Sequence, residues 1–248
     1  MFILSILFFI TAILYSSVGF GGGSTYLALL LIWDVPYYIF PVLALICNII
    51  VVSGNSINYS RAGNLNFRLL IPFLLGSIPF AFIGGAIIIE KELFEIFLFL
   101  ILSVAGISLL VQNKSFEDKK TKYNQPSIIL SFFIGSVLGL ISGVVGIGGG
   151  IFLSPILFLL KAAPPKQIVT TASFFILINS ISGVLGQLTK DSVNDQIFNY
   201  WLLFLVVFIG GQIGNYINLK VFSNRSLALI TASLVIFVAI RMGFKLIS

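Results

Sequence analysis

Long runs of apolar residues, each separated from the next by a short polar stretch, fill most of this chain. About 20 apolar residues are enough to cross a bilayer as a helix. The runs are Phe2–Trp33, about Tyr37–Tyr59, Phe67–Ile89, Leu93–Val111, Ser127–Leu160, about Gln167–Leu188, Ile197–Asn218 and Leu227 to about Ile247. The pattern predicts an all-α polytopic membrane protein.

The two longest runs each contain a cluster of glycines. Val18–Ser24 reads VGFGGGS and Val145–Ile151 reads VGIGGGI, 127 positions later. Glycine weakens a helix by roughly 1 kcal/mol per residue relative to alanine, so four glycines in five positions predict a break. A break within lipid leaves backbone groups unpaired, and matched breaks in two halves are typical of a transporter's substrate site.

The glycines have two other possible interpretations. Glycines in membrane helices also let neighbouring helices approach closely, with no ligand involved. A dinucleotide-binding G-x-G-x-x-G motif is disfavoured, because it would need glycine where Ser24 and Ile151 stand and a surrounding βαβ unit.

The similarity of the two parts extends beyond the glycines. Ser53-Gly54 matches Ser182-Gly183, and Gly85 matches Gly214, both at an offset of 129. An internal repeat is therefore expected. It divides one integral membrane domain into a first repeat (1–112), a polar linker (113–126) and a second repeat (127–248). Each repeat has a glycine-broken first helix followed by three further transmembrane helices.

The orientation of the halves depends on what the broken runs do. If each crosses once, the halves are parallel copies; if each turns back at its glycines, the halves are inverted. Inversion puts most of the basic side chains on one face: Arg61, Arg68, Lys114, Lys119, Lys120, Lys122, Lys161, Lys166, Lys220 and Arg225. A basic face is expected to be cytoplasmic. We expect inverted halves, with the linker in the cytoplasm.

Composition narrows the classes of function. Charged residues make up 9% and hydrophobic residues 58%, against about 25% charged in soluble domains. The chain has no histidine, its acids lie at segment ends or in loops, and its one cysteine, Cys47, is expected to be a buried inert thiol. These features argue against an enzyme, a metal site, a cofactor and a nucleic-acid partner.

The interior offers neutral groups, which suit an anion better than a cation. Helices restarting at about Ser24 and Ile151 would present free N–H groups and a partial positive charge. The candidate substrate-binding residues are Gly19, Gly21, Gly22, Gly23, Ser24, Thr25, Asn48, Gly146, Gly148, Gly149, Gly150, Ile151 and Asn179.

Several of these positions have a structural alternative. Ser24 is also a candidate N-cap, and Asn48 and Asn179 could equally bond a neighbouring helix. Helix–helix bonding is the favoured role for three polar side chains, Asn55, Asn58 and Ser180. Packing is favoured for Gln187, Gln212 and Asn215.

These motifs resemble the TauE/SafE sulfite exporter family. The resemblance lies in VGFGGGS, in VGIGGGIFLSP, in Ser173-Phe174, in Asn179–Gly183 and in Gly210-Gly211-x-x-Gly214, and it covers essentially the whole chain. It implies passage of sulfite, sulfonates or related organic acids across the cytoplasmic membrane. The first half has Leu27-Ala28 where the second has Ser154-Pro155, so the two halves of the site are not expected to be equivalent.

The sequence therefore predicts a multi-pass secondary transporter of the cell membrane that moves a small anion by alternating access. Its expected partners are the anionic substrate and the lipid bilayer. An anion channel and a membrane-embedded accessory or assembly protein without transport activity are the alternatives. The identity of the anion, the direction of transport, the coupling ion and the existence of a homodimer stay open.

Overall fold

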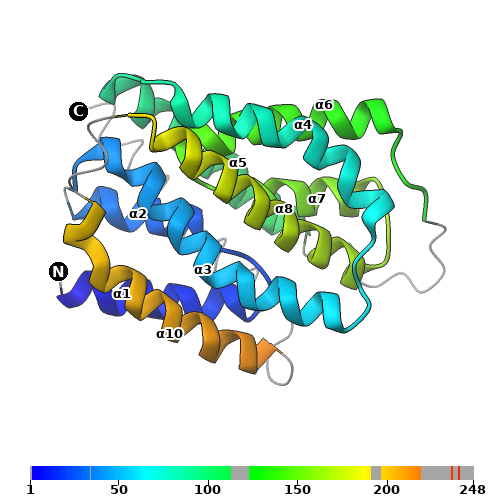
Figure 1. Ribbon diagram of the computed structural model, residues 1–248, viewed down its shortest axis with the longest axis horizontal. Coiled ribbons are helices and arrows are strands. Elements are labelled where there is room, and N and C mark those ends of the chain that lie inside the picture. Colours follow the sequence, from blue (N-terminus) through cyan, green and yellow to red (C-terminus); the bar gives the residue numbers. More distant parts are fainter. Residues whose placement is uncertain are drawn as a thin grey trace.

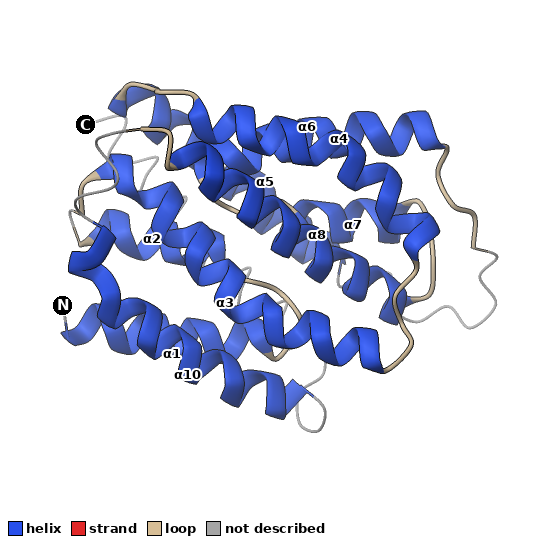
Figure 2. Ribbon diagram, viewed as in Figure 1, coloured by secondary structure: helices blue, strands red, loops and turns tan. Residues whose placement is uncertain are grey.

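The computed structural model describes residues 2–33, 35–112, 123–190, 197–218, 236 and 240, and these residues form helices and loops without any strand (Figures 1 and 2). The elements are α1 (Phe2–Ser16), α2 (Gly23–Ile32), η1 (Tyr37–Ile39), α3 (Phe40–Arg61), α4 (Phe67–Ala86), α5 (Lys91–Gln112), α6 (Ile128–Val145), α7 (Gly150–Leu159), α8 (Pro165–Gln187), η2 (Ile197–Tyr200) and α10 (Trp201–Asn218). The predicted span at 227–247 lies outside the described residues, apart from 236 and 240.

Five helical segments of the described chain are long and apolar enough to cross a membrane. They are Tyr37–Arg61, Phe67–Ala86, Ile128–Val145, Pro165–Gln187 and Ile197–Ile217. Their outward side chains are large and apolar, as lipid requires: Phe67, Leu75, Ile129 and Phe133 are all exposed. The chain is therefore a multi-pass membrane protein, as the hydropathy pattern predicts.

The second glycine-containing run leaves the molecule at the end where it began. The backbone N–H of Asn124, before α6, donates to the carbonyl of Lys161, after α7, at 3.1 Å. With a rise of about 1.5 Å per residue, α6 and α7 laid end to end would separate these residues by about 40 Å. The chain thus turns back between α6 and α7.

The first glycine-containing run also turns back. The amino terminus and the loop from α2 to α3 lie at the same end of the molecule, on the left in Figure 1. Helix α1 runs parallel to α10, since Gly210 approaches Phe9 and Gly214 approaches Ile13. Below, this end (Phe2, 35–39, 87–91 and 197–200) is called the amino end, and the other (61–67, 123–127 and 160–166) the basic end.

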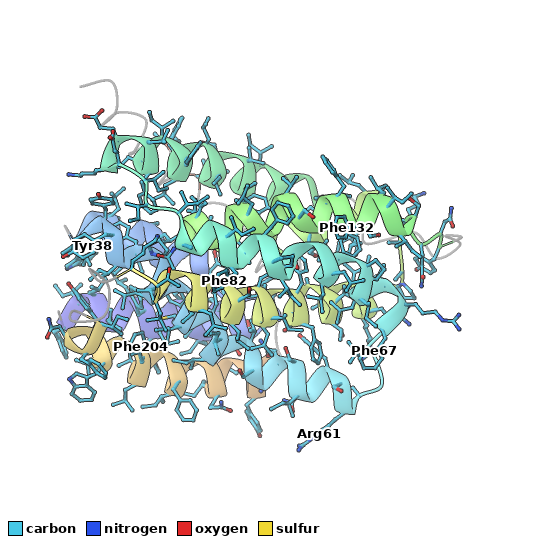
Figure 3. The ribbon with its side chains drawn as sticks, turned by 45° about the horizontal axis from the view of Figure 1, so that its top comes forward. Tyr38, Arg61, Phe67, Phe82, Phe132 and Phe204 are labelled. Atoms are coloured by element: carbon cyan, nitrogen blue, oxygen red, sulfur yellow. The ribbon has the colours of Figure 1, made fainter. Side chains whose placement is uncertain are left out.

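The basic end carries exposed cations and no acid among its described residues. These cations are Arg61, Arg68, Lys161 and Lys166. The amino end is mixed, with Glu90, Lys91 and Glu92 in one turn and Lys190 nearby. Figure 3 shows Arg61 and Phe67 at one end of the molecule and Tyr38 at the other. The positive-inside tendency predicts that the basic end faces the cytoplasm, and this orientation stays a prediction.

The helices form two bundles, and each bundle contains one helix from the other half of the chain. Helix α4 packs most extensively against α6 and then α8, while α10 packs against α1 and then α3. Glycines allow this: a Cβ at Gly135 would strike the backbone carbonyl of Phe73, and one at Gly214 that of Ile13. One bundle contains α1, α2, α3 and α10, and the other contains α4, α6, α7 and α8 (Figure 1).

The two bundles meet where α3 packs against α8. Towards the basic end the contact is polar, with the hydroxyls of Ser56 and Ser173 3.4 Å apart. Towards the amino end it is apolar, since a Cβ at Gly183 would lie 3.0 Å from a methyl carbon of Leu45. The glycine-rich segments lie beside the middle of this seam, next to Asn48 on α3 and Ile176 on α8.

Candidate functional site

Helical structure stops and restarts at both glycine clusters. Helix α1 ends at Ser16 and α2 begins at Gly23, while α6 ends at Val145 and α7 begins at Gly150. The intervening backbone uses left-handed conformations, with φ of +82° at Gly19, +90° at Gly22, +93° at Gly146, +84° at Gly148 and +75° at Gly149. Residues that have a Cβ avoid these angles, which explains why glycine stands at each of these positions.

Both restarted helices begin without a side-chain cap. Gly22 and Gly149 are the N-cap residues and neither start has a side-chain cap hydrogen bond, so the alternative of Ser24 as N-cap is wrong. The first amides to find an acceptor in the helix are those of Thr25 and Phe152, which donate to the N-cap carbonyls. The two preceding N–H groups in each helix thus have no acceptor within it.

Asn48 joins the two breaks. Its Nδ2 donates to the carbonyl of Ile147, in the second break, at 3.1 Å. A Cβ at Gly23 would lie 2.7 Å from this nitrogen, and one at Gly148 would lie 2.8 Å from it. A Cβ at Gly21 would overlap the Asn48 carboxamide oxygen. Glycine is needed here because the two backbones approach one amide from both sides.

The hydroxyls predicted at the first helix start are engaged with another side chain. Tyr15, on α1, places its phenol oxygen 2.7 Å from Thr25 Oγ1 and 3.4 Å from Ser24 Oγ. The sequence analysis missed Tyr15 because it lies in a plain apolar run before the glycines. The available signal was its position one residue before the end of α1, which places it next to the break.

Buried polar side-chain atoms without a hydrogen-bond partner gather around the breaks. In the described part of the chain they belong to Tyr26, Asn48 (Oδ1), Asn55, Ser142, Thr171, Asn179 and Ser180. Tyr26 lies beside Gly22, Ser142 beside Gly149, and Ser180 beside Gly148. Such groups cost about 1–3 kcal/mol each when left unpaired, so a cluster of them marks a place prepared for a polar ligand or water.

The first glycine of each cluster, Gly19 or Gly146, is called its outer glycine. Each outer glycine packs closely against the end of a neighbouring helix. A Cβ at Gly19 would lie 2.7 Å from Tyr59 Oη and 2.9 Å from a Val169 methyl carbon, near the basic end. One at Gly146 would lie 2.5 Å from Pro41 Cα, near the amino end. Gly19 and Gly146 therefore lie at the outer borders of the site, on opposite sides.

The remaining predicted residues lie on or beside the second break. A Cβ at Gly150 would overlap the side chain of Ile176 on α8, and Ile151 is buried in the next position. Asn179 lies three residues after Ile176, on the same face of α8, and is fully buried with neither amide atom bonded.

The expected helix–helix bonds are present in part. Asn58 donates to Asn215 Oδ1 at 3.1 Å, and Gln187 donates to the carbonyl of Gly143 at 2.8 Å, which confirms their structural roles. The same expectation is wrong for Asn55 and Ser180, whose side chains have no partner. Asn55 follows Asn48 by two helical turns and so lies on the same face of α3.

The chemistry of the site is that of neutral donors and acceptors. Among the described residues no group of three or more His, Cys, Asp or Glu side chains could hold a metal ion. Cations in these residues occur only in loops or in the terminal turns of helices. Amide N–H groups, hydroxyls and carboxamides can bind a small oxyanion by hydrogen bonding, helped by the positive ends of α2 and α7.

The sequence model of the family described as Sulfite exporter TauE/SafE matches residues 4–242. The chain belongs to the TauE/SafE family. This is a family of membrane transporters and not of enzymes, which agrees with the sequence-based prediction.

Curated relatives of this TauE/SafE protein are named as transporters. It is 27% identical to the probable membrane transporter protein y4hK of Sinorhizobium fredii, with 93% of each chain covered. It is 24% identical to the probable membrane transporter protein YunE of Bacillus subtilis, over 98% of this chain and 97% of that one. A probable membrane transporter protein of Methanocaldococcus jannaschii shares 29% identity over 77% of this chain and 73% of that one. No solved structure matches significantly.

Proposed function

We propose that this TauE/SafE protein is a secondary transporter that carries a small oxyanion across the cytoplasmic membrane, binding it between the starts of α2 and α7. One observation supports the proposal most strongly: unpartnered buried polar atoms surround two uncapped helix starts in the middle of the fold. A helix pair held together only by packing would bury apolar or paired groups there. The family description points to sulfite, and sulfonates and small carboxylates share its oxyanion chemistry.

The proposal includes an inverted internal repeat. Supporting it, the first glycine-containing run enters and leaves at the amino end, and the second enters and leaves at the basic end. Helices α3 and α8, which follow these runs, then cross in opposite directions (Figure 1). Inverted repeats give a carrier two related conformations that open on opposite sides.

Alternating access would use the two outer glycines as borders. Near the basic end the first break closes against Tyr59 and Val169, and near the amino end the second break closes against Pro41. The α3–α8 seam joins two bundles that are each tightly packed internally. Rocking about this seam would separate one border while keeping the other closed. A carrier of this kind exposes the anion to one side at a time.

The test is uptake of ³⁵S-labelled sulfite into liposomes that contain the purified protein. Gly22→Ala and Gly149→Ala should each lower uptake at least about tenfold, since an alanine at φ near +80° costs about 1–2 kcal/mol and distorts the N-cap turn. The matched control is Gly63→Ala, because Gly63 has φ +72° and nothing within 4 Å of an added Cβ, in a loop at the basic end.

The outcomes separate the alternatives. Uptake that survives in both site variants as it does in Gly63→Ala would overturn the proposed site. Absence of uptake and of binding for sulfite, methanesulfonate and acetate with the natural sequence would favour the accessory-protein alternative. Uptake that is not saturable and shows no counterflow would favour a channel.

A further inference from the structure

The unpaired oxygen of Asn48 restricts the chemistry of the substrate further than the two helix starts do. Asn48 is fully buried, and its Nδ2 is committed to the carbonyl of Ile147 at 3.1 Å. This bond fixes which end of the carboxamide is the oxygen. Oδ1 then points towards the first break at Gly21 and has no donor. A carboxamide oxygen accepts hydrogen bonds and repels a bare anionic oxygen.

The ligand that satisfies the site must therefore offer both kinds of hydrogen-bonding group. The uncapped amides of α2 and α7 require an acceptor, and Asn48 Oδ1 requires a donor. The described residues place no cation in the interior, so a second negative charge would have no counter-charge. Desolvating a dianion in such a neutral site is much less favourable than desolvating a monoanion.

We infer that the substrate is a singly charged oxyanion that carries its own O–H donor, and that this hydroxyl donates to Asn48 Oδ1. This inference rests on the proposed function and restricts its substrate class. Two chemical sources share the feature: a dibasic acid that has kept one proton, such as bisulfite, and a monoanion with a fixed hydroxyl, such as a hydroxyalkanesulfonate. In the first case the substrate itself carries a proton across the membrane.

The ionisable side chains around the site do not complicate this. Among the residues that the structure describes, they are the phenols of Tyr15 on α1, Tyr26 on α2 and Tyr59 on α3, and the Cys47 thiol beside Asn48. Helices α6 and α8 present Ser142, Ile176 and Ser180, which do not titrate. Phenols and thiols have ordinary pKa values of about 10 and 8.5, so between pH 5.5 and 7.5 a change in affinity reports on the ligand.

The experiment measures binding to the purified full chain by isothermal titration. Isethionate is compared with ethanesulfonate, which has the same charge and lacks the hydroxyl. Leaving Oδ1 unpaired should weaken ethanesulfonate about tenfold or more. Asn48→Ala should reduce this preference to near unity, while Asn58→Ala, which removes a carboxamide bonded outside the site, should leave it unchanged. Thermal unfolding shows whether each variant is folded.

A second series distinguishes the two sources of the donor. Sulfite affinity is measured from pH 5.5 to 7.5, where the fraction of bisulfite falls. An affinity that falls with that fraction identifies the acid proton as the donor; a flat profile with a retained isethionate preference identifies a fixed hydroxyl. Equal binding of isethionate and ethanesulfonate would overturn the inference and leave the anion site standing. Binding of no anion would overturn both.

Discussion

The two glycine breaks share left-handed backbone at two matching positions and have different side-chain surroundings. Gly19 and Gly22 have positive φ in the first break, as do Gly146 and Gly149 at the matching positions of the second. Asn48 of α3 lies against both breaks, whereas Ile176 of α8 lies against the second. Tyr15 binds the hydroxyls of the first helix start, while Ser142, 127 positions later, has no partner. The breaks thus share part of their backbone conformation and differ in their side-chain partners, so we expect the side chains to decide what the proposed site recognises.

The largest difference between the breaks is expected at their outer glycines. Gly146→Ala would bring a Cβ to 2.5 Å from the Pro41 backbone, which cannot rotate away, whereas Gly19→Ala meets the side chains of Tyr59 and Val169. Both changes carry the left-handed penalty, and overpacking adds about 1–3 kcal/mol at Gly146. Thermal unfolding in detergent should show Gly146→Ala to be about 1–3 kcal/mol less stable than Gly19→Ala. Equal loss would contradict the asymmetry.

Asn48→Leu tests whether the carboxamide of Asn48 binds the substrate. The variant removes the bond to Ile147 and makes α3 as apolar as α8 is at Ile176. We expect sulfite uptake to fall about 10- to 100-fold, because a buried carbonyl loses its donor and the ligand its acceptor. The control is Asn58→Leu, which removes a carboxamide of the same helix that is bonded to Asn215 outside the site. Unchanged uptake in Asn48→Leu would assign Asn48 to helix packing.

Tyr15→Phe should remove a side-chain contact of the first helix start that has no counterpart at Ser142, the matching position of the second half. It frees the hydroxyls of Ser24 and Thr25 from the phenol, at a cost of about 1 kcal/mol in stability. We expect the apparent affinity for sulfite to change several-fold, with the maximal uptake rate retained. A variant that is indistinguishable from the natural sequence in both stability and affinity would show that this contact is incidental.

The smallest effect is expected at Lys190, outside the membrane-spanning helices at the amino end. Burial lowers the pKa of this amine to about 8, below its ordinary value near 10.5. Because the charged form is disfavoured in the folded state, stability should rise as pH increases from about 8 to 10.5 and should stay at its lower level below pH 8. Solvent screening limits the effect to about 0.5 kcal/mol. Thermal unfolding of Lys190→Gln should lack this dependence; an identical pH profile would refute it.

Much of the fold could be predicted from the sequence because lipid imposes simple rules. Apolar length located the helices, and the four glycines at each cluster located the positions where helical structure stops. The helix starts were expected at about Ser24 and Ile151, and α2 and α7 begin one residue earlier. These features depend on local backbone energetics, which the residue types along the chain determine.

The side-chain partners of the site could not be predicted in the same way. Tyr15 reaching Thr25, or Asn48 reaching Ile147 from 99 residues away, depends on how the bundles pack, and no local pattern encodes that. For the same reason Asn55 and Asn58 look equivalent in sequence, although one is unpaired and the other bonds Asn215. A count of polar residues on a helix face does not reveal which of them already have a partner.

The exchange of α4 and α10 between the bundles has a consequence for how the chain can be divided. Each compact unit includes one helix contributed from the far side of the linker, since α4 lies with α6 and α8 and α10 lies with α1 and α3. A product terminated within 113–126 would leave the glycine-lined contacts at Gly135 and Gly214 unformed. Neither compact unit could therefore be produced whole from a continuous piece of the chain.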